Sequence, residues 1–283
     1  MRPVFVGDVQ GCADELDELL ARVEERIGSA YEAWLVGDLV NRGPASLRAL
    51  ERARELVLAG RARVVLGNHD LSLLRVHYGL RPLLERDTFQ DVLAAPGVDD
   101  LLEWLRRQPL AATGTLGGAT FAMVHAAVHP DWTEAQVAAH ARAVEAVLGG
   151  SRADARALLA GDVAPALVDD LGRLTTCRSA GRDGSWSSEE PSAPESVRLG
   201  RVAWHALWSE RRPGYGVVYG HWAMQGLHVA NGLRGIDTGC VHEGPDHEGY
   251  LTAWLPDPAD PTPFGVPDDS FVRVRAHRRY RRD

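Results

Sequence analysis

Three oxygen-bearing side chains recur at regular intervals near the N-terminus. Asp8, Asp38 and Asn68 each follow a glycine that ends a short apolar run. Carboxylate and amide oxygens are hard ligands, and a shared carboxylate can bridge two divalent cations about 3.5–4 Å apart. Such a cation pair holds the attacking and leaving oxygens of a displacement at phosphorus. The spacing therefore predicts metal-assisted hydrolysis at phosphorus.

Two histidines later in the chain can add nitrogen ligands. His125 and His221 each follow a strand-like apolar run, as the first three residues do. Neutral imidazole suits Mn, Fe, Co or Zn better than Mg. A lone Gly-Asp is typical of a turn, and a lone Asn of a helix N-cap. All five residues in this order favour a metal site over those local explanations.

The elements that must position these side chains follow from the apolar pattern. Short apolar runs at 4–6, 34–36, 64–66, 119–124 and 216–219 predict buried strands. Between the first three runs, apolar residues recur with helical spacing, which predicts strand-loop-helix units. Since open α/β folds place ligands at the carboxyl ends of their strands, we expect the polar clusters to meet at one edge of a sheet.

Composition excludes several classes of protein. A net charge of -8 argues against a stable nucleic-acid partner. The sequence has no lysine, which excludes a P-loop lysine and Schiff-base chemistry. No apolar run is long enough to span a membrane, so we expect a cytoplasmic protein with no membrane partner. Cys12, Cys177 and Cys240 are widely spaced, which predicts free thiols.

The motifs resemble those of the symmetrical diadenosine tetraphosphatases, in the phosphoprotein-phosphatase branch of the calcineurin-like metallophosphoesterases. The resemblance extends over nearly the whole chain and is carried by seven segments: Gly7-Asp8-Val9-Gln10-Gly11-Cys12, 37–44, Gly67-Asn68-His69-Asp70-Leu71, 104–110, Val124-His125-Ala126, Gly220-His221-Trp222-Ala223 and Asp237-Thr238-Gly239-Cys240.

The resemblance implies a fold and its organisation. The fold class is an α/β sandwich with two mixed β-sheets flanked by helices. Residues 1–283 form a single domain, in which about 126–200 supply a helical cap and 179–200 a loop or flap. Residues 256–283 comprise a segment rich in Pro and Asp followed by an arginine-rich tail, which we expect to be solvated.

The resemblance also implies a role for individual residues. Asp8 and Gln10 would bind the first metal ion, and Asp38 would bridge to the second. His69 would act as an acid near the leaving oxygen. Further residues complete the expected site: Asn68, His125 and His221 as ligands of the second metal, and Arg42 and Arg178 as phosphate-binding groups.

The implied activity is hydrolysis of diadenosine tetraphosphate to two ADP, with related dinucleoside polyphosphates as further substrates. Dinucleotide-capped RNA 5′ ends are a possible additional substrate. The implied cofactors are two divalent metal ions, Mn²⁺ being favoured over Co²⁺ or Mg²⁺.

Two positions depart from the phosphatase pattern. Gln10 replaces a histidine, and an amide oxygen is a weaker ligand than imidazole, so we expect the first metal to be held more loosely. Asn41 replaces an aspartate that would pair with His69, so we expect a less basic His69. A nucleoside diphosphate leaves as a phosphate with a pKa of about 6 and needs little acid assistance, which favours an anhydride substrate. A protein Ser/Thr phosphatase and a non-catalytic dinucleotide sensor remain as alternatives.

Overall fold

The first half of the chain folds into strand-loop-helix units, as predicted. A computed structural model describes residues 1–189, 194, 197, 200–244 and 247–280. The early elements are β1 (Arg2–Val6), α1 (Ala13–Ile27), β2 (Tyr31–Leu35), α2 (Ser46–Leu58), β3 (Ala62–Val64), α3 (Asn68–His77), α4 (Gln90–Leu93) and α5 (Val98–Leu105).

The middle of the chain contains a hairpin and three consecutive helices. Its elements are β4 (Ala111–Leu116), β5 (Ala119–Val124), α6 (Glu134–Leu148), α7 (Arg152–Ala160) and α8 (Pro165–Thr176). Thr133 caps α6 by accepting a hydrogen bond from the Gln136 amide, and the Gln136 side chain bonds back to the Thr133 amide. This capping box fixes the start of that helix. The role of 126–200 as a cap stays a prediction.

The last third alternates short strands with turns. Its elements are β6 (Ser179–Ala180), β7 (Trp186–Ser187), β8 (Val202–Ala203), α9 (Trp204–Arg211), β9 (Gly216–Tyr219), η2 (Ala223–Gln225), β10 (His228–Ala230), β11 (Leu233–Gly235), β12 (Asp237–Thr238), η3 (Cys240–His242), β13 (Tyr250–Trp254) and β14 (Phe271–Arg275). No helix in the described part of the chain has the length and apolar character that crossing a membrane requires.

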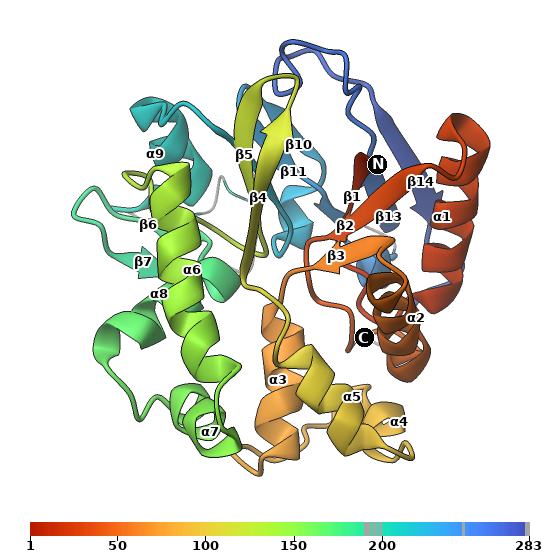
Figure 1. Cartoon of the computed structure of the whole chain (residues 1–283), viewed down its shortest axis with the longest axis vertical. Helices are drawn as coiled ribbons and strands as arrows, with labels where there is room; N and C mark the ends of the chain where they lie inside the picture. The colour runs from red at the N-terminus through yellow and green to blue at the C-terminus, as the bar shows by residue number, and fades with distance from the viewer. Residues whose placement is uncertain (190–193, 195–196, 198–199, 245–246, 281–283) are drawn as a thin grey trace.

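Two mixed sheets form the framework, which confirms the predicted fold class. One sheet has the order β12-β13-β1-β2-β3, with β14 also paired to β13, and the other has the order β10-β11-β9-β5-β4. Within them β1, β2 and β3 run parallel to one another, as do β5 and β9. Figure 1 shows α1 and α2 beside the first sheet and α6 to α8 on the opposite side of the molecule.

Aromatic side chains fill the space between the two sheets. Phe5 from β1 packs edge-on against Phe121 from β5, with ring centroids 5.3 Å apart. Trp254 from β13 stacks on Phe5 at 5.2 Å. Ile236, between β11 and β12, belongs to the same cluster. Because β11 lies in one sheet and β12 in the other, the run 233–238 crosses between them at Ile236.

Two sequence expectations need correction. The segment 179–200 was expected to be a loop or flap, but its first part contains β6 and β7, which join β8 in a small third sheet. Residues 190–193, 195–196 and 198–199 lie outside the described part of the chain. The arginine-rich tail was expected to be solvated from residue 273, yet Arg273 and Arg275 belong to β14. Backbone pairing with β13 explains this, because alternate residues of β14 such as Val274 are buried.

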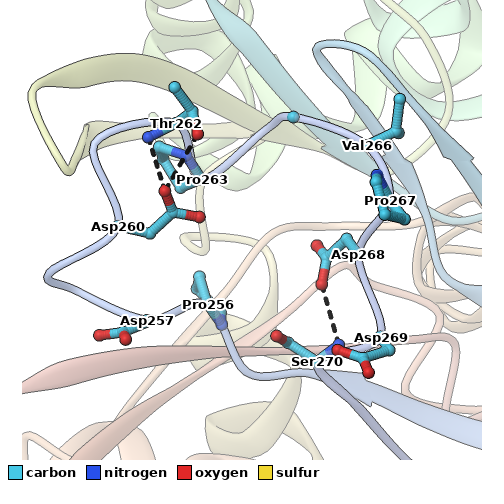
Figure 2. A pocket seen from close by; sticks show the side chains of 11 residues that line it. Pro256, Asp257, Asp260, Thr262, Pro263, Val266, Pro267, Asp268, Asp269 and Ser270 are labelled. Atoms are coloured by element: carbon cyan, nitrogen blue, oxygen red, sulfur yellow. Dashed lines mark hydrogen bonds between the residues drawn. The ribbon is translucent and has the colours of Figure 1, made fainter.

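The segment rich in Pro and Asp is tied to the second sheet by one buried arginine. Arg234 on β11 pairs with Asp268 at 2.9 Å and donates to the carbonyls of Ala230, Pro263 and Gly265. A cavity of about 290 Å³ lies within this segment (Figure 2), where Asp260 and Asp268 accept hydrogen bonds from neighbouring backbone amides. None of the residues lining it is a predicted site residue.

Candidate active site

The predicted metal ligands gather where strands of both sheets end. Asp8 follows β1, Asp38 follows β2, and Asn68 begins α3 just after β3. His125 comes directly after β5, and His221 follows β9. One backbone amide at this junction connects the sheets, since the N–H of His221 donates to both carboxylate oxygens of Asp8 at 3.2 and 3.3 Å. Residues from all five strands therefore meet at one place.

The side chains of Asn68, His125 and His221 converge. One end of the Asn68 side-chain amide lies 3.1 Å from Nε2 of His125 and 2.7 Å from Nδ1 of His221. The other nitrogen of each ring is occupied: His125 Nδ1 donates to the Val36 carbonyl at 2.8 Å, and His221 Nε2 donates to the Thr176 carbonyl at 3.0 Å. Such hydrogen bonds fix which nitrogen of a histidine faces a metal. The arrangement fits the second metal's predicted ligand set.

Asp8, Asp38 and His125 form a buried group whose ligand atoms all lie within 4.8 Å of one another. Burial raises the pKa of Asp8 well above its usual value, and the carboxylates of Asp237 and Asp38 raise it further. Burial acts in the same direction on Asp38, but the rings of His125 and His69 outweigh it and lower the Asp38 pKa. Crowded carboxylates repel one another, and a divalent cation between them removes that repulsion.

Two buried oxygens near this group have no hydrogen-bond partner among the described residues. They are Oε1 of Gln10 and Oδ2 of Asp237. The other oxygen of Asp237 accepts from the Gly239 amide at 3.0 Å, and burial raises the pKa of this carboxyl to about 6. Because buried polar atoms are seldom left unpaired, these two oxygens fit a metal-ligand role.

The backbone at the site is strained at several positions. Positive φ angles occur at Gln10 (47°), Asp38 (50°), Asn41 (80°), Arg42 (67°) and His221 (70°). For residues other than glycine this conformation costs energy, of order 1–3 kcal/mol each, and it clusters at functional sites. The strain falls on the loops predicted to carry the ligands and a phosphate-binding arginine.

Asp70 holds the Asp38 loop against the start of α3. Its carboxylate accepts hydrogen bonds from the amides of Gly67, Asp38 and Leu39, each at 2.9 Å. The His69 amide in turn donates to Asp38 Oδ1 at 2.7 Å. These bonds fix the bridging carboxylate relative to the next ligand along the chain.

His69 is oriented by a chain of side chains that the sequence did not reveal. The side-chain nitrogen of Asn41 lies 3.0 Å from Nδ1 of His69 and 3.2 Å from Oδ1 of Asp87. The Asn41 oxygen accepts from the amides of Arg42 and Thr88, so the direction of the side-chain amide is settled. Nδ1 of His69 is therefore an acceptor, and in the neutral ring Nε2 carries the proton.

A less basic His69 was expected because Asn41 replaces an aspartate, but the main cause in the structure is burial. The pKa of His69 is lowered, and its largest cause is burial; the positive charge of Arg42 acts in the same direction and Asp38 opposes it. The Asp87 carboxylate, which is itself paired with Arg81 at 2.7 Å, lies one side chain behind Asn41. A carboxylate therefore still lies behind His69, but the Asn41 side chain stands between the two.

Both predicted phosphate-binding arginines lie near the metal ligands. Arg42 lowers the pKa of His69, and Nη1 of Arg42 also donates to the Arg86 carbonyl at 3.1 Å. Burial lowers the pKa of His221 well below its usual value, and Arg178 lowers it further. Arg178 also donates to the Ser188 carbonyl at 3.0 Å, which holds it to the segment after β7.

The structure thus brings together every residue predicted for the site and adds three that were not predicted. Asp237, Asp70 and Asp87 contribute the carboxylates described above. Asp237 lies in one of the segments that carry the family resemblance. That segment could not show that Asp237 lies beside Asp8, because their contact depends on where the chain crosses between the sheets. Buried oxygens and neutral imidazoles form a donor set that fits divalent cations.

Comparisons with known proteins agree with this donor set. Residues 1–150 match the profile of the family described as calcineurin-like phosphoesterase. The symmetrical bis(5'-nucleosyl)-tetraphosphatase of Janthinobacterium sp. (strain Marseille) is 38% identical over 255 residues, covering 86% of this chain and 90% of that protein. The protein of the same name from Ralstonia nicotianae (strain ATCC BAA-1114 / GMI1000) is 39% identical to this chain over 256 residues, covering 86% of each chain.

A solved structure shows the same fold in a more distant protein. The cold-active protein-tyrosine phosphatase of a psychrophilic Shewanella species matches with a TM-score of 0.54 and 16% identity, covering 98% of this chain and 80% of that one. At this identity the likeness concerns the fold alone.

Proposed function

Because the chain belongs to the calcineurin-like phosphoesterases and, within them, to the symmetrical bis(5'-nucleosyl)-tetraphosphatases, we propose that it hydrolyses diadenosine tetraphosphate to two molecules of ADP. The observation that carries this proposal is the convergence of Asn68, His125 and His221 beside the buried pair Asp8 and Asp38. Related dinucleoside polyphosphates are proposed as further substrates.

We assign the metal ligands as follows. Asp38 would be shared by two divalent cations, Asp8 and Gln10 would hold the first, and Asn68, His125 and His221 would hold the second. The unpartnered oxygen of Asp237 is proposed as an additional donor to the first ion. When bound, the two ions supply Lewis-acid polarisation of the phosphoryl oxygens and lower the pKa of a coordinated water.

The remaining residues bind and orient the substrate. Arg42 and Arg178 bind phosphate oxygens, for which the planar guanidinium is well shaped. His69 presents Nε2–H to the leaving oxygen, because Asn41 occupies Nδ1. The His69 ring is only partly exposed, and with its lowered pKa it donates a hydrogen bond as a neutral ring more readily than it delivers a full proton. This suits a nucleoside diphosphate leaving group, whose oxygen needs little protonation, better than the alkoxide of a phosphoserine.

Three finer assignments belong to the same proposal. Mn²⁺ is the proposed ion, since the donors combine oxygen and imidazole without sulfur. Dinucleotide-capped RNA ends are proposed as a second substrate class, to be tested by release of the cap nucleotide. The cytoplasm is the proposed location, to be tested by cell fractionation.

Product analysis tests the activity. The protein is incubated with MnCl2 and diadenosine tetraphosphate, and the nucleotides are separated. We expect ADP alone; AMP with ATP would contradict symmetrical cleavage. Release of phosphate from a phosphoserine peptide at a comparable rate would favour a protein phosphatase, and tight binding without turnover would favour a sensor.

A variant of the bridging residue tests the mechanism. Asp38→Asn removes the charge shared by the two ions, and we expect kcat to fall by roughly 1000-fold or more. Asp100→Asn, at an exposed position on α5, is the matched control and should retain wild-type activity. Full activity in Asp38→Asn would refute the bridging assignment.

A further inference from the structure

A second group of metal-binding side chains lies outside the site described above. Cys12, Glu15 and Cys240 are all buried, and each offers a ligand atom within 4.8 Å of the others. Cys12 immediately precedes α1, Glu15 lies in the first turn of that helix, and Cys240 begins η3. The third cysteine, Cys177, is elsewhere, with its thiol directed to the Ser179 carbonyl at 3.5 Å.

The Glu15 carboxylate is held in the manner of a ligating group. Its Oε1 accepts hydrogen bonds from the His277 amide at 2.8 Å and from the Tyr280 hydroxyl. Its Oε2 is buried and has no hydrogen-bond partner among the described residues. Ligating carboxylates are commonly hydrogen-bonded on one oxygen, whereas a buried carboxylate oxygen left unpaired is costly. This carboxylate is oriented by two donors and still has one oxygen to offer.

We propose that Cys12, Cys240 and Glu15 bind one Zn²⁺ ion, separate from the active-site pair. Two thiolates and one carboxylate are typical zinc ligands, and zinc favours four of them in tetrahedral geometry. The Tyr280 hydroxyl donates to Glu15 and so holds this carboxylate in place, and a water molecule would take the fourth position. Binding releases the two thiol protons to solvent.

The donor chemistry separates this site from the active site. The active-site ligands are oxygen and nitrogen atoms, which accept Mn²⁺, whereas soft thiolates select zinc. The two sites can therefore hold different metals in the same molecule.

The zinc ion would join three segments that are distant in sequence. Cys12 is two residues beyond Gln10, and Cys240 is three residues beyond Asp237. Tyr280 belongs to the C-terminal segment after β14. A metal ion held by Cys12 and Cys240, and linked to Tyr280 through Glu15, would fix the loops that carry Gln10 and Asp237. Its role is structural, and this proposal does not depend on the identity of the substrate.

X-ray absorption at the zinc edge tests the proposal on the full chain. The protein is loaded with ZnCl2, exchanged against excess MnCl2 and analysed for both metals. We expect one equivalent of zinc to remain, with a sulfur shell of two atoms at about 2.3 Å. Cys12→Ser and Cys240→Ser should each reduce the sulfur shell, whereas the control Cys177→Ser should leave it unchanged.

Other outcomes would overturn the zinc assignment. Retained zinc with only oxygen and nitrogen neighbours would place it in the active site. Absence of retained zinc, with three free thiols after denaturation, would show that the cluster is a packed pair of thiols. A single free thiol would show a disulfide instead. Because these measurements use the wild-type protein, they stand even if a variant fails to fold. The sulfur signal should also survive in Asp38→Asn, so failure of the active-site assignment is distinguishable.

Discussion

Asp237 is the residue that most alters the ligand set expected for the first metal ion. Gln10 offers only a neutral amide oxygen where the phosphatase pattern has an imidazole. Asp237 places a carboxylate near Asp8, and its Oδ2 has no hydrogen-bond partner among the described residues. An anionic oxygen at this point compensates for a weak neutral ligand, because charge strengthens the attraction to a divalent cation.

Asp237→Asn should therefore weaken binding of the first metal ion. We expect the Mn²⁺ concentration for half-maximal activity to rise by roughly 10- to 100-fold. Metal titration of turnover measures this, with the exposed Asp162→Asn as control. An unchanged metal requirement would exclude Asp237 from the ligand set.

Asp87 contacts His69 through Asn41. Asp87→Ala removes the acceptor that anchors the Asn41 nitrogen, so we expect the His69 ring to lose its fixed orientation. The value of kcat should fall by about 10-fold, equivalent to about 1.4 kcal/mol of transition-state stabilisation, with KM nearly unchanged.

A double-mutant cycle separates this positioning role from a general loss of structure. If Asp87 works through His69, adding Asp87→Ala to His69→Ala should cause little further loss of kcat. Independent, multiplicative losses in the double variant would show that Asp87 serves some other purpose.

At the scale of elements, close approach of the two sheets requires glycine after β9. A methyl group on Gly220 would overlap Oδ1 of Asp8. The neighbouring Gly67 makes an equally close approach to the Asp38 carboxylate. The glycines that precede the ligands thus leave space for carboxylates from neighbouring loops.

Gly220→Ala should displace Asp8 and reduce kcat by roughly 100-fold or more, by analogy with the loss of one preorganised electrostatic group. Gly244→Ala is the control, since among the described residues no atom lies closer than 3.7 Å to a methyl there, and its backbone is not left-handed. Steady-state kinetics, with circular dichroism to confirm folding, measure the effect. Near wild-type kcat in Gly220→Ala would mean that the carboxylate can move without cost.

The sequence was informative about the elements that carry the ligands because apolar runs and helical spacing are local signals. It predicted the strands leading to Asp8, Asp38 and His125. It could not predict that 233–238 divides between two sheets, because the pairing partner of each part is set by the tertiary fold and not by local sequence. It could not place Asp87 behind Asn41, since that contact joins a loop to a distant turn without any periodic pattern.

At the scale of the whole molecule, a buried arginine side chain away from the active site stabilises the fold. Arg234 is fully buried, pairs with Asp268 and lies 5.0 Å from the centre of the Trp254 ring. Its hydrogen bonds to carbonyls of the 256–270 connection hold that segment on the second sheet. The Pro and Asp composition indicated only a loop there, and its partner on β11 was not predictable.

Arg234→Ala should lower the free energy of unfolding by about 3–5 kcal/mol, because Asp268 and several carbonyls lose their buried partner. Urea denaturation measures this. The exposed pair Arg182 and Glu210 provides the control, since Arg182→Ala should cost less than about 1 kcal/mol. A loss of similar size in both variants would contradict the special role of the buried group.

The contact between Asp8 and His221 also bears on the rate at which the folded protein unfolds. These residues are 213 positions apart, so their contact forms only after both sheets have been assembled. Cations bound by the ligands at this junction would belong to the native state alone and would stabilise it in proportion to the logarithm of their concentration. Interactions that form late slow unfolding rather than speed folding. The metal supply would thus govern the lifetime of the folded enzyme in the cell as well as its turnover.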